Sequence, residues 1–347
     1  MRHANAAPDY RRAAHFSDGA FLAAALAVIG MTALVALGAR SWIDQPFAGF
    51  FLRADRTIAA IGRSDWSGAI GTRLFDRTLV AIDGVPVSDS DALQRRVGAK
   101  PIGSPTAFTV TDGATTDTVT IASRRFTRAD YWAVFGAYLA TGLGYVLLAI
   151  LAAWALPARR LGRALLFLGG VGGLFMWSSA DLYPPGASLR IHALAAAFLP
   201  VTLLQFALVV GRARGRFVRA AVPVAWTASV IAAISMQMLL GDPATTRAVQ
   251  ATCDATLGFA LAAATIGVAR RVQLGVELTP LVACTALFGL GIPAAIYLLA
   301  GTLGGIPVNA SATLALLFPL GMSVALVRGD HALLARPLPR FAARRSR

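Results

Sequence analysis

Long apolar runs alternate with short polar segments along most of this chain. A helix needs roughly 20 residues to cross the hydrocarbon core of a bilayer, and eight runs approach that length. They are residues 21–38, 131–156, 164–180, 191–210, 221–240, 251–269, 281–300 and 310–327. The pattern predicts an α-helical integral membrane protein with about eight transmembrane helices. The first helix, 21–38, stands alone, and the other seven form a membrane bundle over 131–327.

Arginine is distributed unevenly among the segments between these runs. Eighteen arginines lie in the segments 1–20, 159–163, 212–219, 270–271 and 328–347. The alternate short segments contain only Arg190 and Arg247. Positively charged loops stay on the cytoplasmic side of a membrane. The asymmetry therefore predicts a cytoplasmic N-terminus (1–20), a basic cytoplasmic tail (328–347) and an extracytoplasmic segment at 39–130.

The overall composition agrees with a protein whose main partner is the lipid bilayer. The chain is 56% hydrophobic and only 14% charged, which is too apolar for a soluble protein with a polar surface. Its net charge of +15 raises the possibility of nucleic-acid binding. However, residues 39–130 contain 12 basic and 10 acidic side chains. Most of the excess positive charge thus belongs to membrane topology, and no nucleic-acid partner is expected.

The first apolar run has two interpretations. Its length exceeds the apolar core of a typical signal peptide, which favours an uncleaved membrane anchor. The small residues in Ala36-Leu37-Gly38 keep cleavage as the alternative.

The segment 39–130 has the polarity of a small globular domain. Its short strand signals are separated by turn signals, and a Ser/Asp-rich stretch precedes an amphipathic helix. The predicted elements are a strand at 79–82, a turn at 83–84, a strand at 85–87, a helix at 92–97 and strands at 106–111 and 118–122. The segment is therefore expected to form an α+β domain.

The motifs of this domain resemble those of bacterial PDZ domains. The resemblance rests on Ile82-Asp83-Gly84-x-x-Val87, on Asp91-x-Leu93 in the short helix and on Gly103, and it covers about 58–123. The chain departs from the PDZ pattern at 71–76, where Gly-Thr-Arg-Leu-Phe-Asp replaces the usual Gly-Leu-x-x-Gly-Asp.

The PDZ resemblance implies a peptide-binding site. Such domains add an extended peptide to a sheet edge and hold its terminal carboxylate with backbone amides. The residues expected to bind a peptide or protein C-terminus are Phe47, Ala48, Gly49, Phe50, Leu52 and Leu93. An alternative is that this aromatic stretch rests on the membrane interface beside Trp42.

The layout of the whole chain resembles the amino-terminal sensory half of certain bacterial membrane signalling proteins. The matching residues are Asp44-x-Pro46-Phe-x-Gly-Phe, Trp66-x-Gly68, Phe126-Thr-Arg-Ala-Asp130-Tyr131 and Val324-Ala-Leu-Val-Arg-Gly-Asp330. The resemblance implies a sensory or regulatory module of the bacterial inner membrane, which detects a peptide or small ligand outside the cytoplasm. No kinase or cyclase motif follows the last run, so a separate cytoplasmic kinase, cyclase or phosphatase is the expected partner.

Ionisable groups near membrane depth are functional candidates because burying them is costly. Asp181, His192 and Asp254 lie near the predicted outer ends of their helices. They are expected to form an outer polar cluster. The alternative is that each simply reaches the water at the lipid headgroups.

Other residues in the runs predict contacts between helices. Gln205 and Gln237 are expected to form interhelical hydrogen bonds. The pairs Gly169-Gly170 and Gly172-Gly173 are expected to permit close helix packing. Aromatic residues at run ends suggest membrane-interface belts; they are Trp42, Trp132, Trp154, Trp177, Tyr183 and Tyr297.

Residues typical of an enzyme are missing from the sequence pattern. The chain has no His-Glu-x-x-His motif, and its single glutamate is Glu277. Cys253 and Cys284 lie within apolar runs and read as small buried hydrophobes. The prediction is a protein that is not an enzyme and has no metal or cofactor. A scaffold or adaptor for envelope proteins is the alternative function, followed by a transporter.

Overall fold

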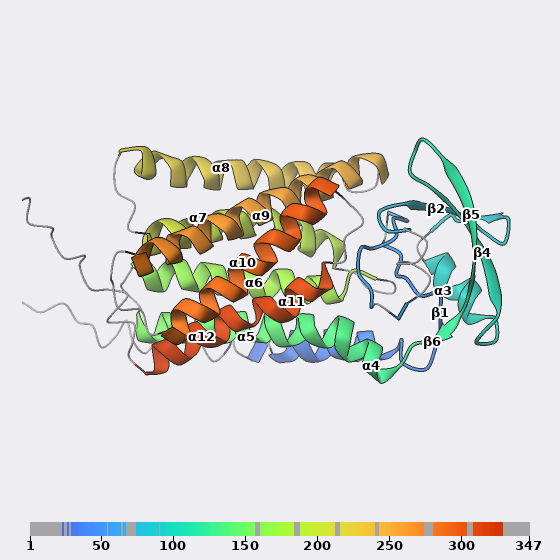
Figure 1. The fold of residues 1–347 in the computed structure, drawn as a ribbon, viewed down its shortest axis with the longest axis horizontal. Coiled ribbons are helices and arrows are strands. Elements are labelled where there is room, and N and C mark those ends of the chain that lie inside the picture. The colour runs from blue at the N-terminus through green and yellow to red at the C-terminus, as the bar shows by residue number, and fades with distance from the viewer. Residues whose placement is uncertain are drawn as a thin grey trace, which may run out of the picture.

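The computed structural model shows an elongated molecule in which a helical bundle occupies most of the length (Figure 1). A small sheet region lies at one end, which we call the sheet end; we call the opposite end the distal end. The structure describes residues 23, 26–27, 29–53, 55–63, 65–66, 74–89, 91–156, 160–183, 188–211, 216–239, 243–273, 280–303 and 308–328.

The sheet region contains a four-stranded antiparallel sheet with the order β3-β2-β4-β5. The strands are β2 (Thr78–Ile82), β3 (Val85–Pro86), β4 (Pro105–Thr111) and β5 (Thr116–Ala122). In β4, Thr106, Phe108 and Val110 alternate inward, as expected for a strand with one buried face. In the helix α3 (Asp91–Gly98), Leu93 and Val97 are buried in the hydrophobic cluster that also contains Phe108 and Val110 of β4. These strands and this helix lie where the sequence predicted them.

Local turn chemistry explains the hairpin between β2 and β3. Ile82 pairs with Val85, so the loop contains only two residues. Asp83 and Gly84 have φ angles of 49° and 75°. A two-residue hairpin turn of this kind requires positive φ at both positions, which Asp and Gly tolerate best.

The chain enters and leaves the sheet region side by side. β1 (Pro46–Phe47) pairs antiparallel with β6 (Arg124–Arg125). The backbone N–H of Asp44 also donates to the carbonyl of Phe126, at 2.8 Å. The sheet region is thus inserted between the first helix and the bundle through one paired connection.

Within the part of the chain that the structure describes, seven helices are long and apolar enough to cross a membrane. The first of them, Arg128–Ala155, is continuous through α4 (Arg128–Tyr131), a π-helical turn (Trp132–Gly136) and α5 (Ala137–Ala155). The others are α6 (Arg160–Ala180), α7 (Leu189–Val210), α8 (Arg216–Leu239), α9 (Pro243–Gln273), α10 (Pro280–Leu303) and the pair α11 (Asn309–Ala315) and α12 (Leu317–Val327). They confirm the predicted bundle of a multi-pass membrane protein.

The predicted span at 21–38 lies partly outside the described residues. Its described part belongs to a shorter apolar helix, Ile29–Arg40. The Tyr131 hydroxyl donates to the carbonyl of Ala36 in this helix, at 3.2 Å. The first helix therefore contacts the bundle at its sheet end, and the eighth crossing stays a prediction.

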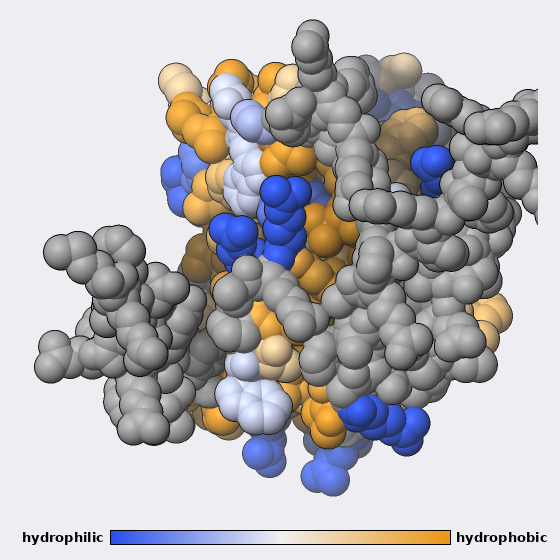
Figure 2. All heavy atoms as spheres, turned by 90° about the vertical axis from the view of Figure 1, so that its left-hand side faces the viewer, coloured by the Kyte–Doolittle hydropathy of each residue, from blue (hydrophilic) through white to orange (hydrophobic). Residues whose placement is uncertain are grey.

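Successive helices of the bundle run in opposite directions, so the sheet region and Arg328 lie at opposite ends (Figure 1). Viewed from the distal end, hydrophilic side chains lie among hydrophobic ones (Figure 2). The arginines at this end whose side chains the structure describes are Arg160, Arg163, Arg270 and Arg328.

Two exposed tryptophans mark the ends of the first bundle helix. Trp132 and Trp154 are 67% and 72% exposed, and a helix rises about 33 Å between them. This length matches the bilayer core, so both residues suit interfacial belts. Trp42, Trp177, Tyr183 and Tyr297 are instead buried within the protein, which corrects the prediction that they face the interface.

The helix α8 lies at the edge of the bundle, beside α7 (Figure 1). Both predicted glutamine contacts join these two helices. The Trp226 indole N–H donates to Oε1 of Gln205 at 3.3 Å, and Nε2 of Gln237 donates to the Arg190 carbonyl at 2.9 Å. Other α8 side chains, such as Ile231 and Met238, are exposed and suit a lipid-facing surface.

Candidate functional site

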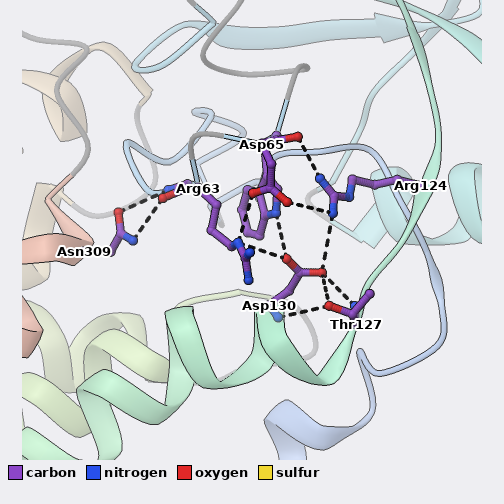
Figure 3. Close-up of polar contacts among 8 residues, drawn as sticks. Arg63, Asp65, Arg124, Thr127, Asp130 and Asn309 are labelled. Carbon is purple, nitrogen blue, oxygen red and sulfur yellow. Dashed lines mark hydrogen bonds and ion pairs between the residues drawn. The ribbon is translucent and has the colours of Figure 1, made fainter.

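The segment around Gly62 fastens the sheet region to the bundle. The Asn309 side chain donates from Nδ2 to the Gly62 carbonyl at 3.0 Å and accepts from the Gly62 N–H at 3.2 Å. The Val308 N–H donates to the Ala60 carbonyl at 2.9 Å. Because Asn309 begins α11, these bonds attach a loop of the sheet region directly to a membrane helix (Figure 3).

The Asp130 carboxylate is a second attachment point. Oδ1 accepts from the Trp66 indole N–H at 3.0 Å, and Oδ2 accepts from the N–H and hydroxyl of Thr127 at 2.8 and 2.7 Å. Two guanidinium groups lie nearby, with Arg63 at 3.5 Å and Arg124 at 3.8 Å (Figure 3). A buried carboxylate needs such partners to offset its lost hydration. Asp130 therefore ties a loop and β6 to the start of the bundle.

Aromatic rings fill the space between these two attachment points. Phe51 stacks on Tyr183 with ring centroids 4.6 Å apart, and it lies 5.6 Å from Phe135 of the bundle. Phe47 and Trp66 add an edge-on contact at 4.8 Å. Phe51 and Phe135 belong to one buried cluster that continues into the bundle. The junction is thus packed like a protein core.

A polar cavity remains within this junction. It has a volume of about 80 Å³ and is partly open. The sheet region lines it with Arg53, Ala59, Ala60, Ile61 and Asp76. The sheet end of the bundle lines it with Tyr138, Phe175, Ser179, Leu182, Tyr183, His192, Asp254, Tyr297, Ala300 and Val308.

His192 is held by neighbours on α6. Its Nδ1 lies 3.2 Å from the Ser178 hydroxyl and 3.4 Å from the Ser179 hydroxyl. Its ring centroid is 4.7 Å from that of Phe175. Both serine hydroxyls also donate to backbone carbonyls of their own helix. These contacts fix the imidazole at the wall of the cavity.

The structure brings together two of the three residues of the predicted outer polar cluster. His192 and Asp254 both line the cavity. Asp181 is not among the lining residues; it accepts a 2.5 Å hydrogen bond from Ser188, across the connection that precedes α7. Sequence reasoning missed Arg53 and Asp76, because nothing in their local sequence shows that they reach the bundle.

The residues predicted to bind a peptide are buried in this structure. Phe47 lies in the aromatic junction, and Phe50 packs edge-on against Phe108 at 5.1 Å. Leu52 forms an isolated bridge with Ile58. Ala48 and Leu93 lie in the core of the sheet region, and Gly49 has a φ of 84°. The peptide-binding role stays a prediction.

Comparison with protein-family models, with curated proteins and with solved structures finds no match to this chain. Among the residues that the structure describes, no group of three or more His, Cys, Asp or Glu side chains is placed to hold a metal ion. Function must therefore be inferred from the geometry of the junction.

Proposed function

We propose that this protein is a sensory or regulatory membrane module that detects a ligand outside the cytoplasm and signals to the cytoplasmic side. The observation that carries the proposal is the polar cavity shared by the sheet region and the bundle. A ligand that contacts both parts favours the arrangement of helices in which it fits best. Detection at the junction is therefore coupled to the position of the membrane helices.

The charges around the cavity support this assignment. Arg53 and Asp76 come from the sheet region, whereas His192 and Asp254 come from α7 and α9. Burying an ionisable side chain near membrane depth costs free energy, so residues such as His192 and Asp254 are functional candidates. A ligand that changes the interactions of these groups changes the energy of the junction directly.

The helices that line the cavity also reach the distal end of the bundle. Tyr138, Ser179, His192, Asp254 and Tyr297 lie on five different spans. Shifts of about 1–2 Å along or around such helices are a common way of transmitting a signal. We propose that the distal end, with its arginines, faces the cytoplasm of a bacterial cell and contacts a kinase, cyclase or phosphatase.

We further propose that the sheet region is a PDZ-like domain whose main task is to close the cavity. This proposal is supported by its small antiparallel sheet, by the Asp83-Gly84 turn and by the buried contacts of α3. Peptide binding would require the buried Phe50 and Leu52 to become accessible.

The test uses native membranes that contain the carboxyl-terminally tagged chain. Cross-linked partners are identified by mass spectrometry for the wild type, for Arg53→Gln and for the control Arg95→Gln, which changes an exposed arginine on α3. We expect a kinase, cyclase or phosphatase whose activity changes with Arg53→Gln but not with the control. Recovery of envelope proteins alone would favour a scaffold. Solute flux through vesicles containing the purified protein would favour a transporter.

A further inference from the structure

We propose that the junction cavity binds a free amino acid with an aliphatic side chain, and this inference rests on the proposed function. The class of ligand follows from three properties of the cavity: its size, the placement of its charges, and a second, apolar cavity that shares two of its lining residues.

The size of the cavity limits the ligand to a small molecule. A water molecule requires roughly 10–15 Å³ of such space. The cavity volume of about 80 Å³ therefore accommodates roughly five to eight non-hydrogen atoms. That range suits a single small amino acid.

The charges in the cavity match a molecule that carries both signs. The guanidinium group of Arg53 and the carboxylates of Asp76 and Asp254 line the same space. A simple amine would face the guanidinium group, and a simple carboxylate would face the two aspartates. A ligand with an ammonium group and a carboxylate meets an opposite charge at each of its own two groups.

The positive charge and one of the negative charges reach the cavity from different parts of the molecule. Arg53 belongs to the sheet region, whereas Asp254 lies on α9 of the bundle. Tyr138 and Tyr297 line the cavity from the bundle side as well. We therefore place the ligand carboxylate near Arg53 and the ammonium group near Asp254, where the tyrosine rings also favour a cation.

The second cavity lies among the membrane helices and has a volume of about 20 Å³. It shares Phe175 and Tyr297 with the polar cavity, so these two side chains lie between the two cavities. Most of its other lining residues are apolar: Met176, Leu199, Leu203, Leu257, Leu261, Pro293 and Ala315. It offers room for one or two more carbon atoms, roughly. We place the aliphatic side chain of the ligand between Phe175 and Tyr297, directed toward this second cavity. Valine, leucine and methionine match the sum of the two volumes, and tryptophan exceeds it.

The experiment measures binding to the full chain in lipid nanodiscs by calorimetry. L-Leucine and L-valine are compared with isopentylamine, 4-methylpentanoate, the dipeptide Leu-Leu and L-tryptophan. We expect saturable binding of leucine and valine, and at least about tenfold weaker binding of the other four. Equal binding of the amine or the acid, or no binding of leucine and valine, would overturn the assignment.

Three variants test the placement of the ligand. Arg53→Gln and Asp254→Asn should each weaken leucine binding about tenfold or more, because each removes one charge partner. Arg95→Gln should leave binding unchanged. Thermal unfolding of each variant shows whether it is folded, and leucine binding unchanged by both cavity variants would contradict the proposal.

A fourth variant avoids changing any charge. Leu261→Phe fills the apolar cavity, so it should weaken leucine binding while leaving alanine binding unchanged. If Leu261→Phe weakened the binding of leucine and alanine equally, the leucine side chain would not occupy the apolar cavity. That result would refute this part of the inference.

The ligand class and the proposed function can fail separately. If no amino acid binds while the cytoplasmic partner still responds to Arg53→Gln, the sensor proposal stands and the ligand class is wrong. If leucine binds and is carried into vesicles, the ligand class stands and the sensor proposal is wrong.

Discussion

At the scale of single residues, Asp130 connects the loop at Trp66, strand β6 and the start of the bundle. Its side chain is 1% exposed, and it is bonded to Trp66 and Thr127 while lying close to Arg63 and Arg124. Water hardly reaches the carboxylate itself, whereas the side chains of Arg63 and Arg124 are 32% and 30% exposed. Loss of its charge removes the charge-assisted hydrogen bonds from Trp66 and Thr127 and weakens the ion pairs with Arg63 and Arg124, which keep Asp65 as a partner.

We predict that Asp130→Asn destabilises the protein by about 2–3 kcal/mol, because the amide keeps the shape but loses the charge-assisted hydrogen bonds of the buried carboxylate. Thermal or chemical unfolding in nanodiscs, followed by the fluorescence of the junction tryptophans, measures the change. The matched control is Asp65→Asn. Asp65 contacts the same two arginines but is 49% exposed, so its loss should cost below about 1 kcal/mol. Equal effects of both variants would contradict this account.

Asp112 controls the turn between β4 and β5. Its carboxylate accepts from the N–H groups of Thr115 and Ala114, both at 2.8 Å. These bonds favour the charged form and lower the pKa of Asp112 to about 2. A lowered folded-state pKa stabilises the hairpin above the ordinary pKa of about 3.9, and the contribution is lost as pH falls toward 2.

We predict that Asp112→Ala lowers the unfolding temperature of the sheet region at pH 6. The difference from the wild type should shrink as the pH falls through the range from the ordinary aspartate pKa down to about 2, because the wild-type carboxylate is then protonated as well. Unfolding curves recorded across this range measure the difference. A difference that does not change with pH would exclude this role for the carboxylate.

At the scale of elements, glycine allows α5 and α6 to approach closely. A methyl group at Gly169 would overlap the Tyr145 carbonyl oxygen and lie 2.8 Å from Cβ of Ala149. Gly172 and Gly173 also face α5, whereas a methyl group at Gly170 would meet nothing within 4 Å. The sequence predicted close packing, but only the structure shows which glycines face the neighbouring helix.

We predict that Gly169→Ala destabilises the bundle by about 1–3 kcal/mol, because α5 and α6 must separate. Gly170→Ala is the matched control. It should be neutral or slightly stabilising, since alanine favours a helix by up to about 1 kcal/mol relative to glycine. Unfolding in detergent or nanodiscs compares the two variants. A destabilised Gly170→Ala with an unaffected Gly169→Ala would contradict the observed packing.

At the scale of the whole molecule, the bundle separates the sheet region from Arg328. The seven spans run alternately between the two ends. The arginine distribution predicts which end faces the cytoplasm, because positively charged segments are retained there. The direction of signalling in our proposal depends on this orientation.

We predict that Ala114→Cys, in the exposed β4–β5 turn, reacts with a membrane-impermeant maleimide on intact cells. Arg328→Cys should react only after the cells are permeabilised. Both variants are made in a background that lacks Cys253 and Cys284. The reverse labelling pattern would place the sheet region in the cytoplasm and overturn the proposed direction of sensing.

The sequence by itself determined the features that depend on neighbouring residues. Hydrophobicity over a span of the bilayer is a local property, so the seven long helices could be predicted from composition and length. The Asp83-Gly84 turn follows from the φ angles that these two residues tolerate. The placement of His192 and Asp254 at one end of the bundle follows from the alternating direction of the spans.

Only the tertiary structure decided which distant groups meet. The bonds of Asn309 to Gly62 join residues far apart in the chain, and Arg53 and Asp254 line one cavity that no local pattern encodes. Asp181, which resembles Asp254 in sequence context, bonds to Ser188 instead. Such contacts depend on how the sheet region docks on the bundle, and docking is set by the complementary shape and charge of whole surfaces.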